Sequence, residues 1–180
     1  VGPFHPLTIG GPRMMAALDD EVVKKIKMEV GYLHRGVEKI CEQSKYNEII
    51  PYIERLNYYA SAMNSLGICK AIEDLMDIEI PARAQLIRMI FAELSRVIHH
   101  LHAIARLSTV IGVIGSVTLI QEQIEKLYDL CAQVCGVRLN FSLNRIGGVA
   151  YDLPLGWISA IFELLKSIGP ELNQIDRLLT

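Results

Sequence analysis

Apolar and polar positions follow two different patterns along the chain. Within residues 13–30, apolar residues at 26, 28 and 30 alternate with Lys27 and Glu29 after a polar Asp19-Asp20 pair, and this period of two predicts a β-hairpin. Beyond residue 35, apolar residues recur at intervals of three and four, which is typical of amphipathic helices. We therefore expect a mainly α fold of the α+β type, in which an N-terminal β-hairpin precedes a helical bundle.

Proline and glycine residues divide the helical part into segments. A short helix is expected from Val37, and longer helices are expected over residues 58–76, 81–107, 118–134 and 158–179. Stretches rich in glycine and proline predict irregular loops at 2–12 and 145–157. We expect two domains: a loop and hairpin in residues 1–34, and a helical bundle in 35–180 that is incomplete at its C-terminal end.

The composition favours a protein that contacts other chains. Hydrophobic residues make up 51% of the 180 residues and charged residues 21%, which predicts more apolar surface than a soluble monomer exposes. The 18 basic and 20 acidic residues are intermixed, so there is no extended basic face for a nucleic-acid backbone. We expect no nucleic-acid partner. The best candidate for a membrane span, residues 107–120, is shorter than the ~20 residues that a bilayer requires.

The four cysteines do not predict a metal or disulfide site. No two of them form a Cys-x-x-Cys pair, and Cys131 and Cys135, which share a helix face, are too few to hold zinc or an iron-sulfur cluster. We interpret them as small buried apolar residues with reduced thiols.

The most informative segment is residues 50–58, which places Arg55 and Tyr58 just inside a predicted strong helix. Tyrosine offers a phenolic donor on a rigid ring, and arginine is a fixed positive charge with five donors. Together they suit a redox enzyme that holds a carbonyl-bearing substrate beside an electron carrier. The same pair also occurs as a contact at a helix end and a half-buried ring, so the pair alone leaves both interpretations open.

A group of histidines and charged residues lies on the predicted helix 81–107. Its spacing does not match the Glu-x-x-His pattern of a di-iron bundle, because Arg96 stands three residues after Glu93. We expect instead a buried polar network of Glu93, Arg96 and His100 that orients the bundle, and no metal site.

Six motifs occur in an order that carries a family resemblance. They are Gly2-Pro3-x-His5-Pro6, Gly31-Tyr32-Leu33-His34-Arg35-Gly36-x-Glu38-Lys39, Pro51-Tyr52-x-x-Arg55-x-x-Tyr58, Pro81-x-Arg83-Ala84-Gln85-x-Ile87-Arg88, Glu93-Leu94-Ser95-Arg96 and Arg145-Ile146-Gly147-Gly148-Val149-x-x-Asp152-Leu153-Pro154. With them the chain resembles the hydrogenase-derived quinone-site subunit of respiratory complex I, the proton-pumping NADH:quinone oxidoreductase. The resemblance covers almost all of the chain and implies a fold like that of nickel-iron hydrogenase large subunits. Because the family continues well beyond Thr180, it also implies a truncated chain.

The resemblance implies roles for particular residues. Tyr58 matches the catalytic tyrosine whose hydroxyl meets the quinone headgroup, and Arg55 matches the arginine beside the terminal 4Fe-4S cluster of a partner subunit. His5, Ile9 and Val110 fall on quinone-facing positions, and Asn140 falls on a cluster-facing position.

Some of these positions depart from the family pattern. Ile9 and Asn140 stand in place of histidines, and Val110 and Asn57 stand in place of aspartates. Ile9 and Val110 do not titrate, so the protons for quinone reduction would come from Tyr58, from water or from another chain.

The resemblance also implies cofactors, partners and a location. The chain itself would bind no cofactor; quinone would be the substrate, and NAD would be used elsewhere in the complex. Its partners in a hetero-oligomeric complex would be the small iron-sulfur subunit, other peripheral-arm subunits and membrane-arm subunits. It would be peripheral on the matrix or cytoplasmic side of a mitochondrial inner or bacterial plasma membrane.

Two alternatives stay open. The first is a subunit of a hydrogenase-related energy-converting membrane complex without the nickel and iron, because Asn57 and Ala60 stand where the hydrogenases have cysteines. The second is a degenerate subunit that serves only as a helical scaffold, since Ile9 and Val110 would equally suit a packed core.

Overall fold

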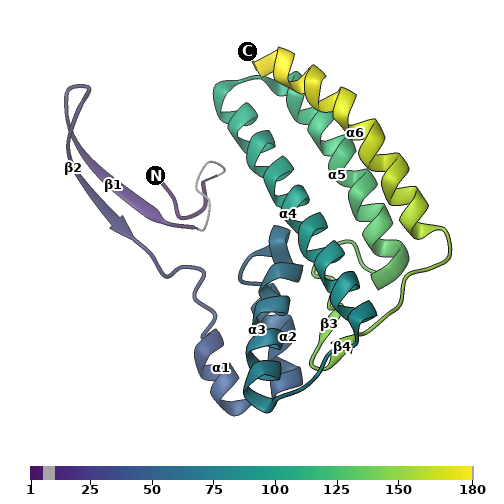
Figure 1. Cartoon of the computed structure of the whole chain (residues 1–180). Coiled ribbons are helices and arrows are strands. Elements are labelled where there is room, and N and C mark those ends of the chain that lie inside the picture. The colour runs from purple at the N-terminus through teal and green to yellow at the C-terminus, as the bar shows by residue number, and fades with distance from the viewer. Residues whose placement is uncertain (6–10, 180) are drawn as a thin grey trace. The chain divides into compact units, whose positions relative to one another are not determined.

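The computed structural model describes residues 1–5 and 11–179, which fall into two compact units, Val1–Glu42 and Gln43–Thr180. The predicted mainly α fold with an N-terminal hairpin is confirmed (Figure 1). The division after residue 42 groups most of the first helix with the hairpin, and the domain boundary expected after residue 34 stays a prediction. No helix among the described residues combines the length and apolarity that crossing a membrane requires.

The first unit is built on the predicted hairpin. Strands β1 (Arg13–Asp19) and β2 (Val22–Glu29) pair antiparallel, with Ala16 opposite Ile26 and an irregularity between Ala17 and Leu18. The unit also contains most of helix α1 (Val37–Gln43), which was expected to begin at its observed first residue.

The second unit opens with two helices joined by a tight turn. Helix α2 (Tyr46–Glu54) was not predicted, and it is followed by the 3-10 helix η1 (Tyr58–Ala60) and by α3 (Ser61–Met76). The prediction that Arg55 and Tyr58 lie inside one strong helix is therefore wrong: Arg55 caps the C-terminus of α2, and Tyr58 opens η1. The helix is interrupted because Asn57 is extended, with φ −140° and ψ 99°.

Three long helices form the main layer of this unit. The predicted helices are confirmed as α4 (Ala82–Ile111), α5 (Ile114–Cys135) and α6 (Trp157–Leu179), which lie side by side in Figure 1. Gly112 and Gly136 end α4 and α5 in the left-handed conformation, with φ of 84° and 70°, which favours glycine.

The core of the unit lies where these helices meet. Trp157 is 2% exposed, stacks on Phe91 with 5.6 Å between ring centroids, and donates from its indole nitrogen to the carbonyl of Leu130 at 2.8 Å. These contacts join α6 to α4 and α5.

The predicted loop at 145–157 contains an element that the sequence did not indicate. Strands β3 (Asn144–Arg145) and β4 (Gly148–Val149) form a short hairpin, whose turn contains Gly147 at φ 90°. The prediction of an irregular loop is wrong for this part because a two-residue strand has no readable alternation.

Candidate functional site

The turn between α2 and η1 carries the two residues that the sequence singled out. Tyr58 is 47% exposed, and no hydrogen bond joins its hydroxyl to another of the residues that the structure describes. Arg55 is also exposed, and its guanidinium donates to the carbonyl of Pro51 at 2.8 Å. The phenol and the guanidinium are therefore both presented at the surface, close together in the sequence.

A buried carboxylate joins this turn to a distant loop. Glu54 is 1% exposed, and its two oxygens accept hydrogen bonds from the backbone N–H of Ser142 at 3.0 and 3.1 Å. Burial raises the pKa of Glu54, and the bond from Ser142 partly opposes this shift. Arg55 follows Glu54 directly and Asn140 lies two residues before Ser142, so the structure brings together the segments that hold both expected cluster-facing residues.

The loop around Asn140 has an unusual backbone. Asn140 and Ser142 both have positive φ, at 55° and 49°, and the buried side-chain oxygen of Asn140 lacks a hydrogen-bond partner among the described residues. A buried polar atom without a partner costs free energy, so the loop is held by other contacts such as the bond to Glu54.

The structure does not gather all the predicted quinone-facing residues. Val110 lies in the last turn of α4 with its side chain 62% exposed, and η1 packs against the same helix. His5 is exposed and belongs to the other unit. Ile9 lies outside the described residues. The predicted roles of all three stay predictions.

The predicted buried network on α4 is wrong. Glu93 and Arg96 do form an ion pair, but both side chains are half exposed and His100 is exposed too. The pair joins residues three apart on one outward helix face, where solvent screens it, so it does not orient the bundle.

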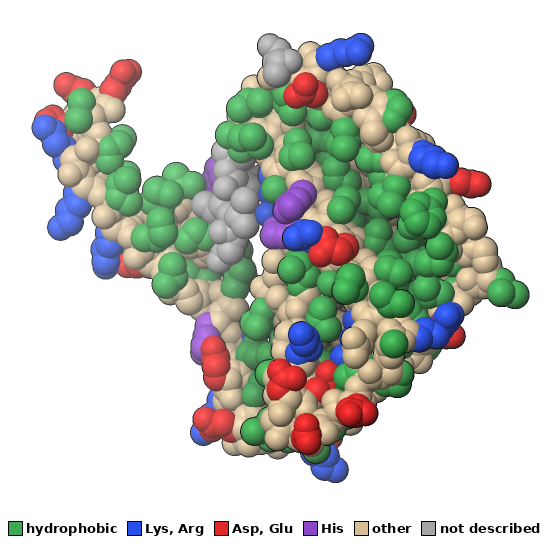
Figure 2. Space-filling view, in the orientation of Figure 1, with side chains coloured by type: hydrophobic (Ala, Val, Ile, Leu, Met, Phe, Trp, Pro, Cys, Tyr) green, Lys and Arg blue, Asp and Glu red, His purple; other side chains and the backbone are tan. Residues whose placement is uncertain are grey.

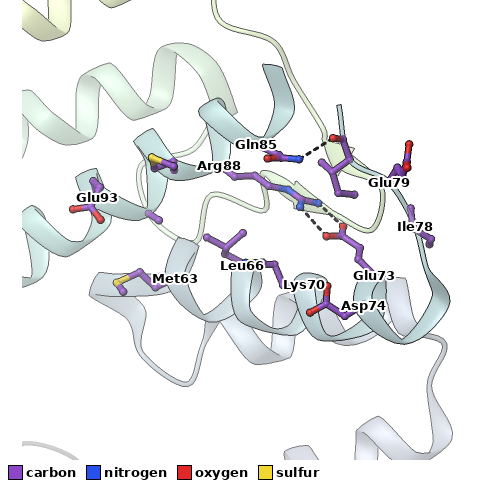
Figure 3. A pocket seen from close by; sticks show the side chains of 13 residues that line it. Met63, Leu66, Lys70, Glu73, Asp74, Ile78, Glu79, Gln85, Arg88 and Glu93 are labelled. Atoms are coloured by element: carbon purple, nitrogen blue, oxygen red, sulfur yellow. Dashed lines mark hydrogen bonds and ion pairs between the residues drawn. The ribbon is translucent and has the colours of Figure 1, made fainter. Parts of the chain in front are cut away.

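The buried polar network lies earlier on the same helix. The Arg88 guanidinium contacts the Glu73 carboxylate of α3 at 2.5 and 2.9 Å, and both side chains are almost fully buried (Figure 3). Arg88 also donates to the carbonyls of Arg145 and Gly148, and Glu73 accepts from the N–H of Gly147. This network joins α3, α4 and the β3–β4 hairpin. An arginine inside the apolar stripe of α4 was the sequence signal for it.

The electrostatics of Glu73 follow from these partners. Burial alone would raise its pKa, but the hydrogen bonds from Arg88 and Gly147 and the arginine charge outweigh burial and hold the pKa of Glu73 below its ordinary value. The pair is therefore ionised at neutral pH.

Two pockets lie on the second unit. The larger, about 720 Å³ in volume, lies between α3 and α4 and has the Arg88–Glu73 pair in its wall (Figure 3). The smaller, about 330 Å³, is bordered by the first turns of α4 and α6 and the segment 153–156. Tyr58 lines neither of them, and no group of three or more potential metal ligands occurs among the described residues.

Comparisons with known proteins decide the family. Residues 110–180 match the family model of the 49 kDa subunit of respiratory-chain NADH dehydrogenase. Over 99% of its length, the chain is 44% identical to the fused C/D-type subunit of NADH-quinone oxidoreductase from Bdellovibrio bacteriovorus. The chain belongs to the family of D-type subunits of NADH-quinone oxidoreductase.

Other D-type subunits show the same extent of similarity. The chain is 40% identical over its whole length to the D-type subunit of Methylacidiphilum infernorum, and 38% identical over 96% of its length to that of Bacillus mycoides. It spans 32% of the length of the Bdellovibrio protein, 43% of the Methylacidiphilum protein and 47% of the Bacillus protein. The family resemblance found in the sequence is therefore confirmed for a chain that covers less than half of these relatives.

Proposed function

We propose that this chain is part of the quinone-reducing subunit of an NADH-quinone oxidoreductase, a hetero-oligomeric complex of an energy-converting membrane. Its relatives are named as subunits of that enzyme, and the chain matches them along its entire length. The single observation that carries the assignment to a site is the exposed turn that presents Tyr58 next to Arg55. The 4Fe-4S cluster would belong to a small iron-sulfur partner subunit, and NAD would react elsewhere in the complex.

Each side chain of the turn has a separate role in this proposal. The Tyr58 hydroxyl donates a hydrogen bond to a carbonyl oxygen of the quinone, which favours the negative charge that develops there on reduction. The Arg55 guanidinium lies toward the electron-donating cluster, where a fixed positive charge favours the reduced state. Glu54 supports both roles because it ties the turn to the loop that carries Asn140.

The proposal also fixes where protons do not come from. Val110 and Ile9 are apolar, so neither position supplies a proton to the reduced quinone. We propose that the Tyr58 hydroxyl, replenished from water, is the donor within this chain. The subunit would lie peripherally on the matrix or cytoplasmic side of the membrane.

The first prediction concerns Tyr58. Tyr58→Phe removes only the hydroxyl, so we expect quinone reduction by the assembled complex to fall about tenfold or more while assembly is unchanged. Turnover with NADH and a series of quinone concentrations measures the effect. Tyr52→Phe, a nearby exposed tyrosine of α2, is the matched control and should retain wild-type turnover.

The same measurement separates the alternatives. Normal quinone turnover in Tyr58→Phe would contradict the proposal and favour a scaffold role. Loss of turnover with an acceptor other than quinone would favour the hydrogenase-related complex. That alternative rests on Asn57 and Ala60, which provide an amide and a methyl group where the hydrogenases have thiolate ligands.

A further inference from the structure

A cluster of aromatic and basic side chains lies directly beside the Tyr58 turn. The Tyr59 ring packs on the His102 imidazole with 4.0 Å between centroids, and the Arg106 guanidinium carbon lies 4.8 Å from the centre of the same Tyr59 ring. The His102 Nε2 atom is 3.1 Å from the hydroxyl of Tyr128 on α5. We call Tyr59, His102, Arg106 and Tyr128 the Tyr59 cluster; it joins η1, α4 and α5.

The members of the Tyr59 cluster hold one another in an arrangement with two neutral partners around Tyr59. Burial, together with the charge of Arg106 and the nearby His99, lowers the pKa of His102, although Glu125 partly opposes the shift. Burial raises the pKa of Tyr128 to about 12. The imidazole and the phenol are thus neutral at pH 7, and a neutral imidazole exchanges one hydrogen bond with Tyr128 and stacks on Tyr59 without repelling Arg106.

The geometry of η1 transmits this arrangement to Tyr58. The element has only three residues, Tyr58, Tyr59 and Ala60, and a 3-10 helix has about three residues per turn, so their side chains point in three different directions. Ala60 is buried and Tyr59 is held by the cluster, whereas Tyr58 is exposed. Two sides of the turn are therefore anchored, and the third side presents Tyr58.

We propose that Tyr59 is a positioning residue for Tyr58: gripped by His102 and Arg106, it sets the place of the η1 turn and so the place of the Tyr58 hydroxyl. This inference rests on the role of Tyr58 proposed above. Tyr59 itself does not touch the quinone. Its contribution is to reduce the number of positions that the Tyr58 ring samples, which improves the alignment of a donor with its acceptor.

The test uses the complete complex with two substitutions at one position. Tyr59→Leu removes the ring that packs on His102, and we expect the KM for quinone to rise about threefold to tenfold, with a smaller fall in kcat and unchanged assembly. Tyr59→Phe keeps the ring and loses only the hydroxyl, so it should restore KM to within about twofold of the wild type. A purely structural role would lower the amount of complex without this split between KM and kcat.

Matched controls and a second variant make every outcome decisive. His100→Ala removes an exposed histidine of the same helix and should leave KM unchanged. If Tyr59→Leu fails to assemble, Tyr128→Phe takes its place: it deletes one oxygen, releases His102, and should raise KM about twofold or more. An unchanged KM in whichever variant is decisive overturns the positioning role.

The failure of this inference differs from the failure of the proposed function. Tyr58→Phe, measured beside these variants, reports on the proposed function alone. A large loss in Tyr58→Phe with no change in Tyr59→Leu would remove the positioning role and retain the quinone site. No loss in Tyr58→Phe would remove both.

Discussion

Individual side chains in this protein differ most where burial controls their chemistry. Cys69, Cys131 and Cys135 are buried in the helical unit, whereas Cys41 on α1 is partly exposed. Burial raises the pKa of Cys69 to about 11 and that of Cys135 to about 12, and it raises the pKa of Cys131 as well. Since the thiolate is the reactive form, these three thiols are inert in the folded chain.

This difference gives a prediction for thiol labelling. At pH 8, a thiol reagent such as iodoacetamide should modify Cys41 first, and should modify Cys69, Cys131 and Cys135 only after denaturation. Peptide mass spectrometry identifies the labelled residue. Rapid labelling of Cys131 in the native protein would contradict the packing between α4 and α5.

The Arg88–Glu73 pair gives a second prediction at the residue scale. Arg88→Met leaves a buried carboxylate without its partner, so we expect the free energy of unfolding to fall by about 3–5 kcal/mol. The exposed pair offers a control, because Arg96→Met should cost less than about 1 kcal/mol. Thermal denaturation of the assembled protein measures both changes, and equal effects would contradict the assigned burial.

The same pair implies a pH dependence with a defined sign. The pKa of Glu73 is lower in the folded than in the unfolded chain, where the ordinary value is 4.5. The folded state therefore binds fewer protons, and the stabilisation is fully present above the unfolded pKa and is lost as the pH falls through the folded pKa.

At the scale of elements, the glycines test how the helices end. Gly136 ends α5 with φ 70°, whereas Gly67 lies inside α3, and an added methyl group would meet no atom within 4 Å at either position. Gly136→Ala should therefore destabilise the protein by about 1 kcal/mol through backbone strain alone, and Gly67→Ala should stabilise it by roughly 0.5–1 kcal/mol. Opposite shifts of the thermal midpoint are expected; a shift of the same sign would contradict the caps.

The elements also show what the sequence could predict. The long helices α4, α5 and α6 were predicted because a repeat of three and four residues is readable over more than 20 positions in each. Helix α2 was missed because it has only nine residues and contains Pro51, and proline normally indicates a helix start or a break. The β3–β4 hairpin is too short for a periodic signal.

The candidate site divides in the same way. Arg55 and Tyr58 could be found from their residue types and spacing, but the contact of Glu54 with Ser142 joins residues 88 apart in the sequence, and no local pattern indicates it. The Glu93–Arg96–His100 network was predicted from proximity along one helix. Burial instead depends on which face of α4 meets α3 and α5, and that face carries Arg88.

At the scale of the whole molecule, apolar surface is the dominant feature. Figure 2 shows hydrophobic side chains spread over the part of the second unit where α5 and α6 lie. Phe162 and Leu165 of α6 are 60% and 45% exposed, and Ile114 at the start of α5 is 72% exposed. Surfaces of this kind usually contact other chains.

We therefore expect residues 1–180 expressed alone to be insoluble or to aggregate. Light scattering and sedimentation after expression without partner subunits measure this outcome. Replacing Phe162 and Leu165 by glutamine should shift the chain toward the soluble fraction, and a stable soluble monomer of the unaltered chain would contradict the prediction.

The stacked indole at the centre of the helical unit has a practical consequence. Trp157 is the single tryptophan of the chain, and it contacts Phe91 and the carbonyl of Leu130 at the junction of three helices. Its intrinsic fluorescence therefore reports on this junction and on no other part of the sequence. A red shift of the emission would mark the moment at which water reaches the space between α4, α5 and α6, which makes the chain its own optical probe of unfolding.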